Sequence, residues 1–375
     1  MNVLITGGAG FIGTQLARRL IRENCRVTIL DNFSPQIHGA AAVLPPDLAE
    51  HVTLIAGDIR DRAAVARALA GQEIVVHLAA ETGTGQSMYE VERYEDVNLK
   101  GTAILLEHLV NAQTKTVKKI VVASSRAIYG EGKYACPQHG TVYPAMRTVA
   151  DMQAGRFEPV CPQCGSACTH LPTDEASRLD PSSFYGLTKQ MQEQMTLLFA
   201  QALDISAFAL RYQNVYGPGQ SLHNPYTGIL AIFSNQARRN QPIYIFEDGQ
   251  ESRDFVYIDD VVEATWRCIS AEGQHRVALN VGSGQQTTVG EVVGEIVAFF
   301  GSSSEVVVTG GFRIGDIRHN VADLTDIRRL LDFEPKWQFK DGIQQFLAWA
   351  AAETAATTGY ERSLDELRAR GLMHG

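Results

Sequence analysis

The stretch NVLITGGAGFIGTQLARRL, residues 2–20, decides the fold of this 375-residue chain. It starts with a short apolar run typical of a buried parallel strand, and the apolar spacing over residues 11–24 is typical of an amphipathic helix. Glycines between a strand and a helix allow a tight turn, close approach of the backbone to a pyrophosphate, and close packing of the two elements. The unpaired N–H groups at the helix N-terminus attract the phosphates. We therefore predict a dinucleotide-binding loop, whose cofactor contacts are Gly7, Gly10, Phe11, Ile12 and Gly13.

The next apolar run, RVTILD at residues 26–31, predicts a second strand that ends in an acid. Asp31 follows Gly10 by 21 residues, the spacing at which a carboxylate accepts a hydrogen bond from a ribose 2′-OH. The same carboxylate repels a 2′-phosphate, so the sequence favours NAD over NADP. Asn32, which follows directly, is expected to lie against the cofactor as well.

Further apolar runs alternate with helical segments along the chain. Strands are predicted at residues 52–58, 73–80, 119–125 and 206–212, and helices at about 61–70, 95–112 and 182–203. Near-continuous apolar strands separated by helices are typical of a parallel sheet covered on both faces, so the fold class is α/β with a Rossmann-type doubly wound sheet. We expect an NAD-binding domain, an insert and a smaller mixed α/β substrate domain, at residues 1–132 with 170–212, 133–169 and 213–375. Residues 253–272 are expected to pack back onto the first domain, and residues 352–375 to form a charged helix or tail.

Composition excludes several classes of partner. Hydrophobic residues make up 45% of the chain and charged residues 20%, which suits a large buried core. The net charge of −9 argues against a nucleic-acid or anionic-membrane partner. No apolar run approaches the roughly 20 residues of a membrane span, and the first residues lack the features of a secretory signal. We expect a cytoplasmic protein.

The segment SSFYGLTKQ places Tyr185 and Lys189 four residues apart, on one face of a predicted helix. Such a pair alone is common by chance and usually means a surface aromatic and a solvated lysine. Together with the glycine loop and with Ser125 at a strand end, we interpret it as a catalytic set. A free phenol has a pKa of about 10, too high for a base at neutral pH. A neighbouring ammonium and the positive nicotinamide ring would favour the phenolate, and Ser125 would hold the substrate hydroxyl in line.

Nine stretches together resemble the extended branch of the short-chain dehydrogenase/reductase superfamily, the nucleotide-sugar epimerases and dehydratases: TGGAGFIG, DNFS, GDIRD, VVHLAA, VNLKGT, ASSRAIYG, YGLTK, LRYQNVYGPGQ and RDFVYIDDV. They cover most of the chain outside the insert and the extreme C-terminus. The resemblance implies NAD contacts near the adenine and the nicotinamide from Asp58, Ile59, Leu78, Ala79, Ala80, Asn98, Tyr185 and Lys189. It implies a nucleotide-diphosphate sugar as substrate, with Ser125 at the chemistry and Asn214, Arg253 and Arg318 on the diphosphate. From their places in the sequence, we expect Thr82 and Arg126 to contact the substrate as well. It also implies a homodimer built on a four-helix face that includes the Tyr185 helix.

One departure from the branch bears on the reaction. Nucleotide-sugar 4,6-dehydratases carry an Asp-Glu pair just after the serine, whereas Arg126 and Ala127 stand at these positions here. Without that acid and base, elimination of water has no evident proton carrier, so we favour 4-epimerisation through a 4-keto sugar. Alternatives are a single-direction nucleotide-sugar reductase or oxidase, a 4,6-dehydratase and, last, a non-catalytic NAD-binding protein.

The detailed pattern is similar to that of dTDP-L-rhamnose 4-epimerases, on the stretches GEGKYACPQHG, CPQCG, GPGQSLHNPYTGILAIF and IFEDGQESRDFVYIDD. Glu81 and Thr82 are more polar than a deoxy-sugar would suggest, and Gln213 stands where an aromatic residue is usual. A UDP-hexose or a uronate therefore stays open as the substrate. Arg126 would suit a carboxylate, although a salt bridge at the domain boundary is the alternative.

Four of the six cysteines lie between residues 136 and 168. CPQHG at 136–140 and CPQCG at 161–165 are two knuckles of the C-x-x-C/H type, and two such turns converge on a tetrahedral Zn²⁺. We predict a zinc-ribbon-like insert with a structural ion, because four protein ligands close the coordination shell. A disulfide is disfavoured in a reducing cytoplasm. The predicted ligands are Cys136, His139, Cys161 and Cys164, with Cys168 and His170 as substitutes.

Overall fold

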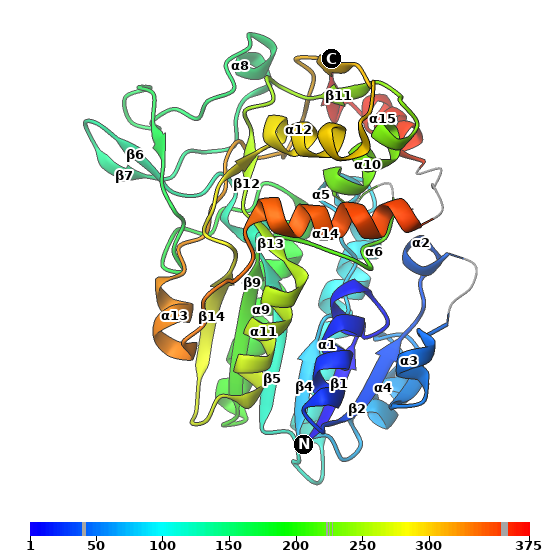
Figure 1. The fold of residues 1–375 in the computed structure, drawn as a ribbon. Coiled ribbons are helices and arrows are strands. Elements are labelled where there is room, and N and C mark those ends of the chain that lie inside the picture. The colour runs from blue at the N-terminus through cyan, green and yellow to red at the C-terminus, as the bar shows by residue number, and fades with distance from the viewer. Residues whose placement is uncertain (40–42, 223, 225, 227, 354–358) are drawn as a thin grey trace.

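A parallel sheet forms the centre of the protein, which a computed structural model describes over residues 1–39, 43–222, 224, 226, 228–353 and 359–375 (Figure 1). Within these residues the sheet has seven strands in the order β14-β9-β5-β4-β1-β2-β3, and all neighbours run parallel. This order confirms the doubly wound fold. The strands are β1 (Asn2–Thr6), β2 (Arg26–Asp31), β3 (Val52–Ala56), β4 (Ile74–His77), β5 (Lys119–Ser125), β9 (Ser206–Tyr212) and β14 (Arg276–Val281). Six of them were predicted, and β14 was not.

Helices cover both faces of the sheet because alternate side chains of each strand point to opposite sides. Val3 and Ile5 of β1 pack into the core that α1 and α11 share, whereas Leu4 packs into the core beneath α4 and α7. Helix α11 lies against α1, and Arg19 pairs with Glu263 across this contact at 2.7 Å. The helices of the two layers are α1 (Phe11–Arg22), α4 (Arg62–Leu69), α7 (Gly101–Asn111), α9 (Phe184–Ala202), α11 (Ile258–Ser270) and α13 (Thr325–Leu331).

Short elements connect the strands, and most of them follow the carboxyl ends of the strands, on the side of the predicted site. The helix expected over 95–112 begins with a π-helical segment, η1, and β5 runs directly into a 3₁₀ turn, η2. Single π turns within helices often mark functional sites. These elements are α2 (Pro35–His38), α3 (Pro46–Ala49), α5 (Thr84–Ser87), α6 (Val91–Tyr94), η1 (Glu95–Lys100) and η2 (Arg126–Tyr129).

The C-terminal part is a smaller mixed α/β structure that lies over the carboxyl ends of the strands (Figure 1). Its strands form two-stranded pairs: β10 (Asn214–Tyr216) with β13 (Phe255–Tyr257), β11 (Ile243–Ile245) with β16 (Val306–Val308), β12 (Ser252–Arg253) with β15 (Thr287–Thr288), and β17 (Phe312–Arg313) with β18 (Met373–His374). Its helices are α10 (Ile229–Arg238), α12 (Val289–Phe300), α14 (Phe339–Ala352) and α15 (Tyr360–Ala369). The predicted tail is therefore structured where it is described: α15 is helical, and β18 docks on β17.

The insert folds as a small three-stranded antiparallel sheet in the order β7-β6-β8, at the upper left of Figure 1. Its own core is small and consists of Tyr134, Cys136, Val142 and Cys161. A core of this size contributes little hydrophobic stabilisation. The elements are β6 (Tyr134–Cys136), β7 (Gly140–Val142), α8 (Val149–Gln153) and β8 (Thr169–His170).

Candidate active site

The glycine loop lies where β1 meets α1, at the carboxyl end of the sheet. Gly7 has a φ of +68°, and a Cβ there would stand 2.8 Å from the backbone nitrogen of Ala79, which follows β4. The loop therefore packs with bare backbone against the end of β4, between β1 and β4, where the strand order reverses. Ligands of doubly wound sheets bind at this switch point.

The acid at the end of β2 lies beside this loop. The Asp31 carboxylate is 7% exposed and accepts hydrogen bonds from the backbone N–H groups of Ala9 (2.9 Å) and Phe33 (2.8 Å). Next to it, the Asn32 amide donates to Asp58 at 2.9 Å. The hydrogen bonds from Arg60 lower the pKa of Asp58 to about 2, so this carboxylate is ionised. A loop without room for side chains beside a fixed carboxylate suits the pyrophosphate and ribose of NAD.

Ser125 and Tyr185 meet because η2 and α9 lie in backbone contact. A Cβ on Gly186 would stand 2.4 Å from the carbonyl oxygen of Ala127, so a glycine is required at this crossing. Helix α9 begins at the Ser183 cap, whose hydroxyl accepts from the Gly186 N–H at 3.1 Å. The predicted serine and tyrosine are thus brought together from two segments 60 residues apart.

The electrostatics of the tyrosine differ from the expectation. Burial raises the pKa of Tyr185, while its interaction with the Ser125 hydroxyl and the charge of Arg126 lower it. Lys189 is 3% exposed and donates to Gln192 Oε1 at 2.7 Å, and burial lowers its pKa to about 7. In the structure, Arg126 is the cation whose charge lowers the pKa of Tyr185, and the role expected of Lys189 stays a prediction.

Asn98 holds the chain that follows β4. Its side-chain oxygen accepts from the Glu81 N–H at 2.8 Å, and its amide donates to Thr188 Oγ1 on α9 at 2.9 Å. These bonds fix the segment that carries the predicted nicotinamide-side contacts, Leu78, Ala79 and Ala80. Ile59, the second residue expected near the adenine, is buried against Gly101 at the start of α7.

A cavity of about 230 Å³ lies between the sheet and the C-terminal part. Three predicted substrate residues, Asn214, Arg126 and Arg253, line it. Within the described residues, Arg126 has no hydrogen-bond or ion-pair partner, so the alternative of a salt bridge is not seen, and its guanidinium is available to an anion. Thr82 does not line the cavity, whereas Thr84 and Gly85 do. The carbonyl of Thr82 accepts from the Tyr94 hydroxyl at 2.7 Å.

The structure corrects the prediction for Arg318. This side chain is 1% exposed and bonded to Glu158 (2.7 Å), Asp248 (2.7 Å) and Glu247 (3.1 Å), and it lies outside the cavity lining. Arg313 lines the cavity instead, and its Nε is held by Asp316 at 2.9 Å. The spacing of the sequence does not show which of two arginines five residues apart lines the cavity, so the place of Arg313 could not be predicted.

The C-terminal helix α15 forms part of the cavity wall, through Tyr360, Ser363 and Leu367. Glu366 anchors the helix, because its carboxylate accepts from the hydroxyls of Tyr89 (2.9 Å) and Tyr226 (3.0 Å). No role for this segment is predicted from the sequence.

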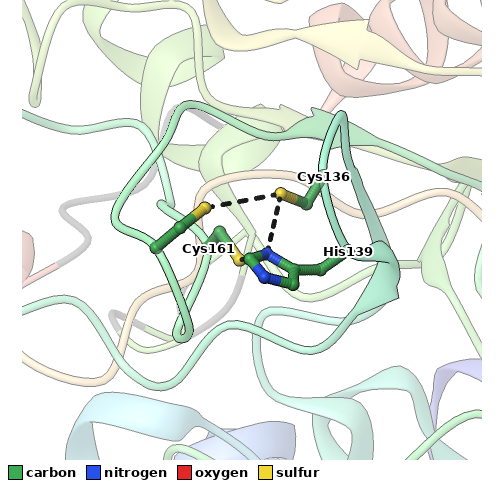
Figure 2. A group of neighbouring side chains, drawn as sticks. Cys136, His139 and Cys161 are labelled. Atoms are coloured by element: carbon green, nitrogen blue, oxygen red, sulfur yellow. Dashed lines mark hydrogen bonds between the residues drawn. The ribbon is translucent and has the colours of Figure 1, made fainter.

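The two knuckles of the insert converge as predicted. The ligand atoms of Cys136, His139, Cys161 and Cys164 all lie within 4.8 Å of one another. Figure 2 shows the sulfurs of Cys136 and Cys161 beside the His139 ring, at 3.6 and 3.5 Å from Nδ1. The sulfurs of Cys136 and Cys164 are 3.7 Å apart.

These separations fit a tetrahedral zinc site. With Zn–S bonds of about 2.3 Å and Zn–N bonds of about 2.0–2.1 Å, a tetrahedron has S···S edges of about 3.8 Å and S···N edges of about 3.6 Å. The two substitutes lie outside the group: Cys168 donates to the carbonyl of Ser166, and the His170 ring packs on Tyr134 at 5.1 Å.

A protein with this sheet and this glycine loop is a dinucleotide-dependent enzyme of the α/β class, and α9 brings its tyrosine to Ser125, which directly precedes the cavity residue Arg126. A family model described as the NAD dependent epimerase/dehydratase family matches residues 3–151 and 160–282. The chain belongs to this family, which confirms the membership that the motifs indicated. In the described residues, no helix combines the length and apolar character needed to cross a membrane.

Known proteins resemble the chain over nearly its whole length. It is 40% identical over 356 residues to a dTDP-L-rhamnose 4-epimerase of Burkholderia thailandensis, covering 94% of this chain and 95% of that one. A UDP-glucose 4-epimerase of Thermotoga maritima, solved with UDP-glucose, is similar with a TM-score of 0.76 and 29% identity, over 93% of this chain and 98% of that one. A UDP-glucose 4-epimerase of Thermus thermophilus, solved with NAD, has a TM-score of 0.71 and 26% identity, over 94% of this chain and all of that one.

Proposed function

We propose that the protein is an NAD-dependent nucleotide-sugar 4-epimerase that acts on a dTDP- or UDP-linked sugar such as dTDP-L-rhamnose. One observation carries the choice of reaction: Tyr185 meets Ser125, and the two residues that follow Ser125 offer no acid and base for dehydration. These residues are Arg126, which lines the cavity, and Ala127. The 40% identical relative, named a dTDP-L-rhamnose 4-epimerase, supports the sugar.

The chain's own residues account for the proton and for orientation. Tyr185 Oη takes the proton of the sugar 4-hydroxyl, which the Ser125 hydroxyl holds in line, and later returns it. NAD, held by the glycine loop and Asp31, would supply the redox chemistry at C4, a reversible hydride transfer. Asn214, Arg253 and Arg313 line the cavity where they would hold the diphosphate, about which the 4-keto sugar turns.

The reaction is tested by giving the purified protein dTDP-, UDP-, GDP- and CDP-sugars without added NAD, and identifying products by NMR. An epimer at C4 is expected for at least one sugar, and Tyr185→Phe should lower kcat by about 10²–10⁴-fold with NAD binding retained. Tyr143→Phe, in the insert, is the matched control and should keep full activity. A product that forms only with stoichiometric turnover of NAD(H) would replace the epimerase by a reductase or oxidase.

We also propose one structural zinc ion per chain, held by Cys136, His139, Cys161 and Cys164. The ion would close a segment whose own core is small, and binding of zinc to such ligands contributes on the order of 10 kcal/mol. Metal analysis should find about one zinc per chain, lost in Cys161→Ser and kept in Cys168→Ser, because Cys168 lies in the insert outside the ligand group. Less than about half an equivalent of zinc, with every thiol freely titratable, would refute the site.

For the assembly we propose a homodimer. Helix α9 exposes large apolar side chains at Leu187, Met191 and Leu198, which are 43%, 38% and 64% exposed. Val110 on the neighbouring helix α7 is 38% exposed. A stripe of this kind on two adjacent helices suits a four-helix contact with a second copy. We also propose a cytoplasmic location, because a reducing compartment would keep the cysteine ligands of the zinc site from forming disulfides.

A further inference from the structure

The insert contributes a buried arginine, Arg147, to the substrate-binding part of the protein. Its side chain is 4% exposed. Nε donates to Glu131 at 3.0 Å, and Nη1 donates to Glu247 at 2.8 Å and to the Phe157 carbonyl at 3.2 Å. Nη2 donates to the backbone carbonyl of Asp316 at 2.8 Å. The guanidinium thus joins the insert to two segments that line the cavity.

The first of these segments is the turn over residues 313–316. Arg313 and Asp316 both line the cavity and pair with each other. Arg147 holds this turn from the side of the insert, and the Ser182 hydroxyl holds it from the start of α9, donating to the Gly315 carbonyl at 2.8 Å. The position of the Arg313 guanidinium in the cavity therefore depends on a contact made by the insert.

The second segment carries Glu247, which also lines the cavity. Its carboxylate accepts from Arg147 at 2.8 Å and from Arg318 at 3.1 Å. Its backbone φ is +49°, a conformation that a glutamate adopts only when its surroundings impose it. Without Arg147 this carboxylate would keep Arg318 as its cationic partner, so Arg147 also reduces the negative charge that an anionic diphosphate would meet in the cavity.

We propose that Arg147 is a positioning residue for the diphosphate of the substrate, and that the metal-closed insert sets substrate affinity through it. The inference rests on the proposed function, because it takes a sugar nucleotide as the substrate. Arg147 does not line the cavity, so it acts through Arg313, Asp316 and Glu247. Its removal therefore changes binding of the diphosphate and leaves the step at C4 intact.

The test compares Arg147→Met and Arg147→Lys with Arg156→Met as the matched control. Arg156 is an exposed arginine of the same insert that pairs with Asp151. For Arg147→Met we expect the KM for the sugar nucleotide to rise about tenfold or more, with kcat within about twofold, because a charged hydrogen-bond network is broken. Calorimetry with UDP or dTDP alone should show the same loss of affinity, with NAD affinity and zinc content unchanged. Lysine keeps the charge beside Glu247 without the planar fork, so Arg147→Lys should recover part of the loss.

A purely structural role gives a different result. Arg147→Met would then lower the melting temperature and the activity per chain at an unchanged KM, and that outcome overturns the inference. If the methionine variant does not fold, the test uses Arg147→Lys alone. An unchanged KM and an unchanged affinity for UDP or dTDP in the lysine variant would then overturn the inference. A wild-type protein that epimerises no sugar nucleotide but binds UDP or dTDP in an Arg147-dependent manner refutes the proposed function and supports the inference.

Discussion

Replacing Gly7 by alanine should lower the free energy of unfolding for two separate reasons, backbone strain and a steric clash. The residue has a φ of +68°, and left-handed backbone costs an L-residue about 1–2 kcal/mol. The new Cβ would also stand 2.8 Å from Ala79 N and 2.9 Å from Ala79 Cα, and forcing such a contact costs about 1–3 kcal/mol. Because alanine restricts the unfolded chain more than glycine does, it offsets about 0.4–1 kcal/mol of this loss of stability. We expect Gly7→Ala to lower the free energy of unfolding by about 3 kcal/mol, measured in urea, and to weaken NAD binding as the loop shifts.

Two further glycines separate these costs. Gly71 has a φ of +71° with no atom within 4 Å of an added Cβ, so Gly71→Ala should cost about 1 kcal/mol and leave NAD affinity unchanged. Gly13 lies in α1 without a positive φ, and its Cβ would stand 2.6 Å from Gly8 Cα. Gly13→Ala should therefore weaken NAD binding through the clash alone. The reasoning fails if Gly7→Ala matches Gly71→Ala in both unfolding free energy and NAD affinity.

Three other outcomes are expected. Because burial lowers the pKa of Lys189 from 10.5 to about 7, the unfolded chain binds a proton that the folded chain releases, and stability falls as the pH drops from about 10.5 to about 7. Lys189→Met should therefore be more stable than the wild type in urea at pH 7.5 while activity is lost, and equal pH dependence of the two proteins would contradict this. Deletion of residues 359–375 removes a cavity wall and should raise the KM for the sugar nucleotide at constant NAD affinity, which calorimetry would check. Leu198→Glu should convert a dimer into a monomer in light scattering, whereas Val308→Glu, on β16 and 55% exposed, should not.

Much of the sheet could be predicted because its strands are continuous apolar runs. The exception, β14, is an edge strand whose first three residues are only partly buried, so RVALNV lacks a long apolar signal. Its place is decided by pairing with β9, about 70 residues earlier, and no local pattern carries that information. The π-helical turn around Asn98 was also missed, since helical spacing does not distinguish it from an α-helix.

The chemical groups of the site were predictable where the signal is local. The glycine loop, the spacing of Tyr185 and Lys189 and the two knuckles are each contained in a few residues. What the sequence could not supply are contacts between distant segments. Arg147 and Asp316 are 169 positions apart, and Arg313 lines the cavity whereas Arg318 is bonded to Glu158, Asp248 and Glu247 outside its lining. The part played by Arg126 in the pKa of Tyr185 likewise depends on the packing of η2 on α9.

The pairing of Tyr134 with His170 has a consequence for protein engineering. These two residues are neighbours across an antiparallel ladder, where Cα atoms are about 5 Å apart, a gap that a two-residue turn spans. The chain therefore leaves for the insert and returns at almost the same point. Residues 135–169 form a cassette: an Asn-Gly turn in their place would close the hairpin without changing the path of the chain at Ser125 or Tyr185, and the same cassette could be grafted onto a relative that lacks it.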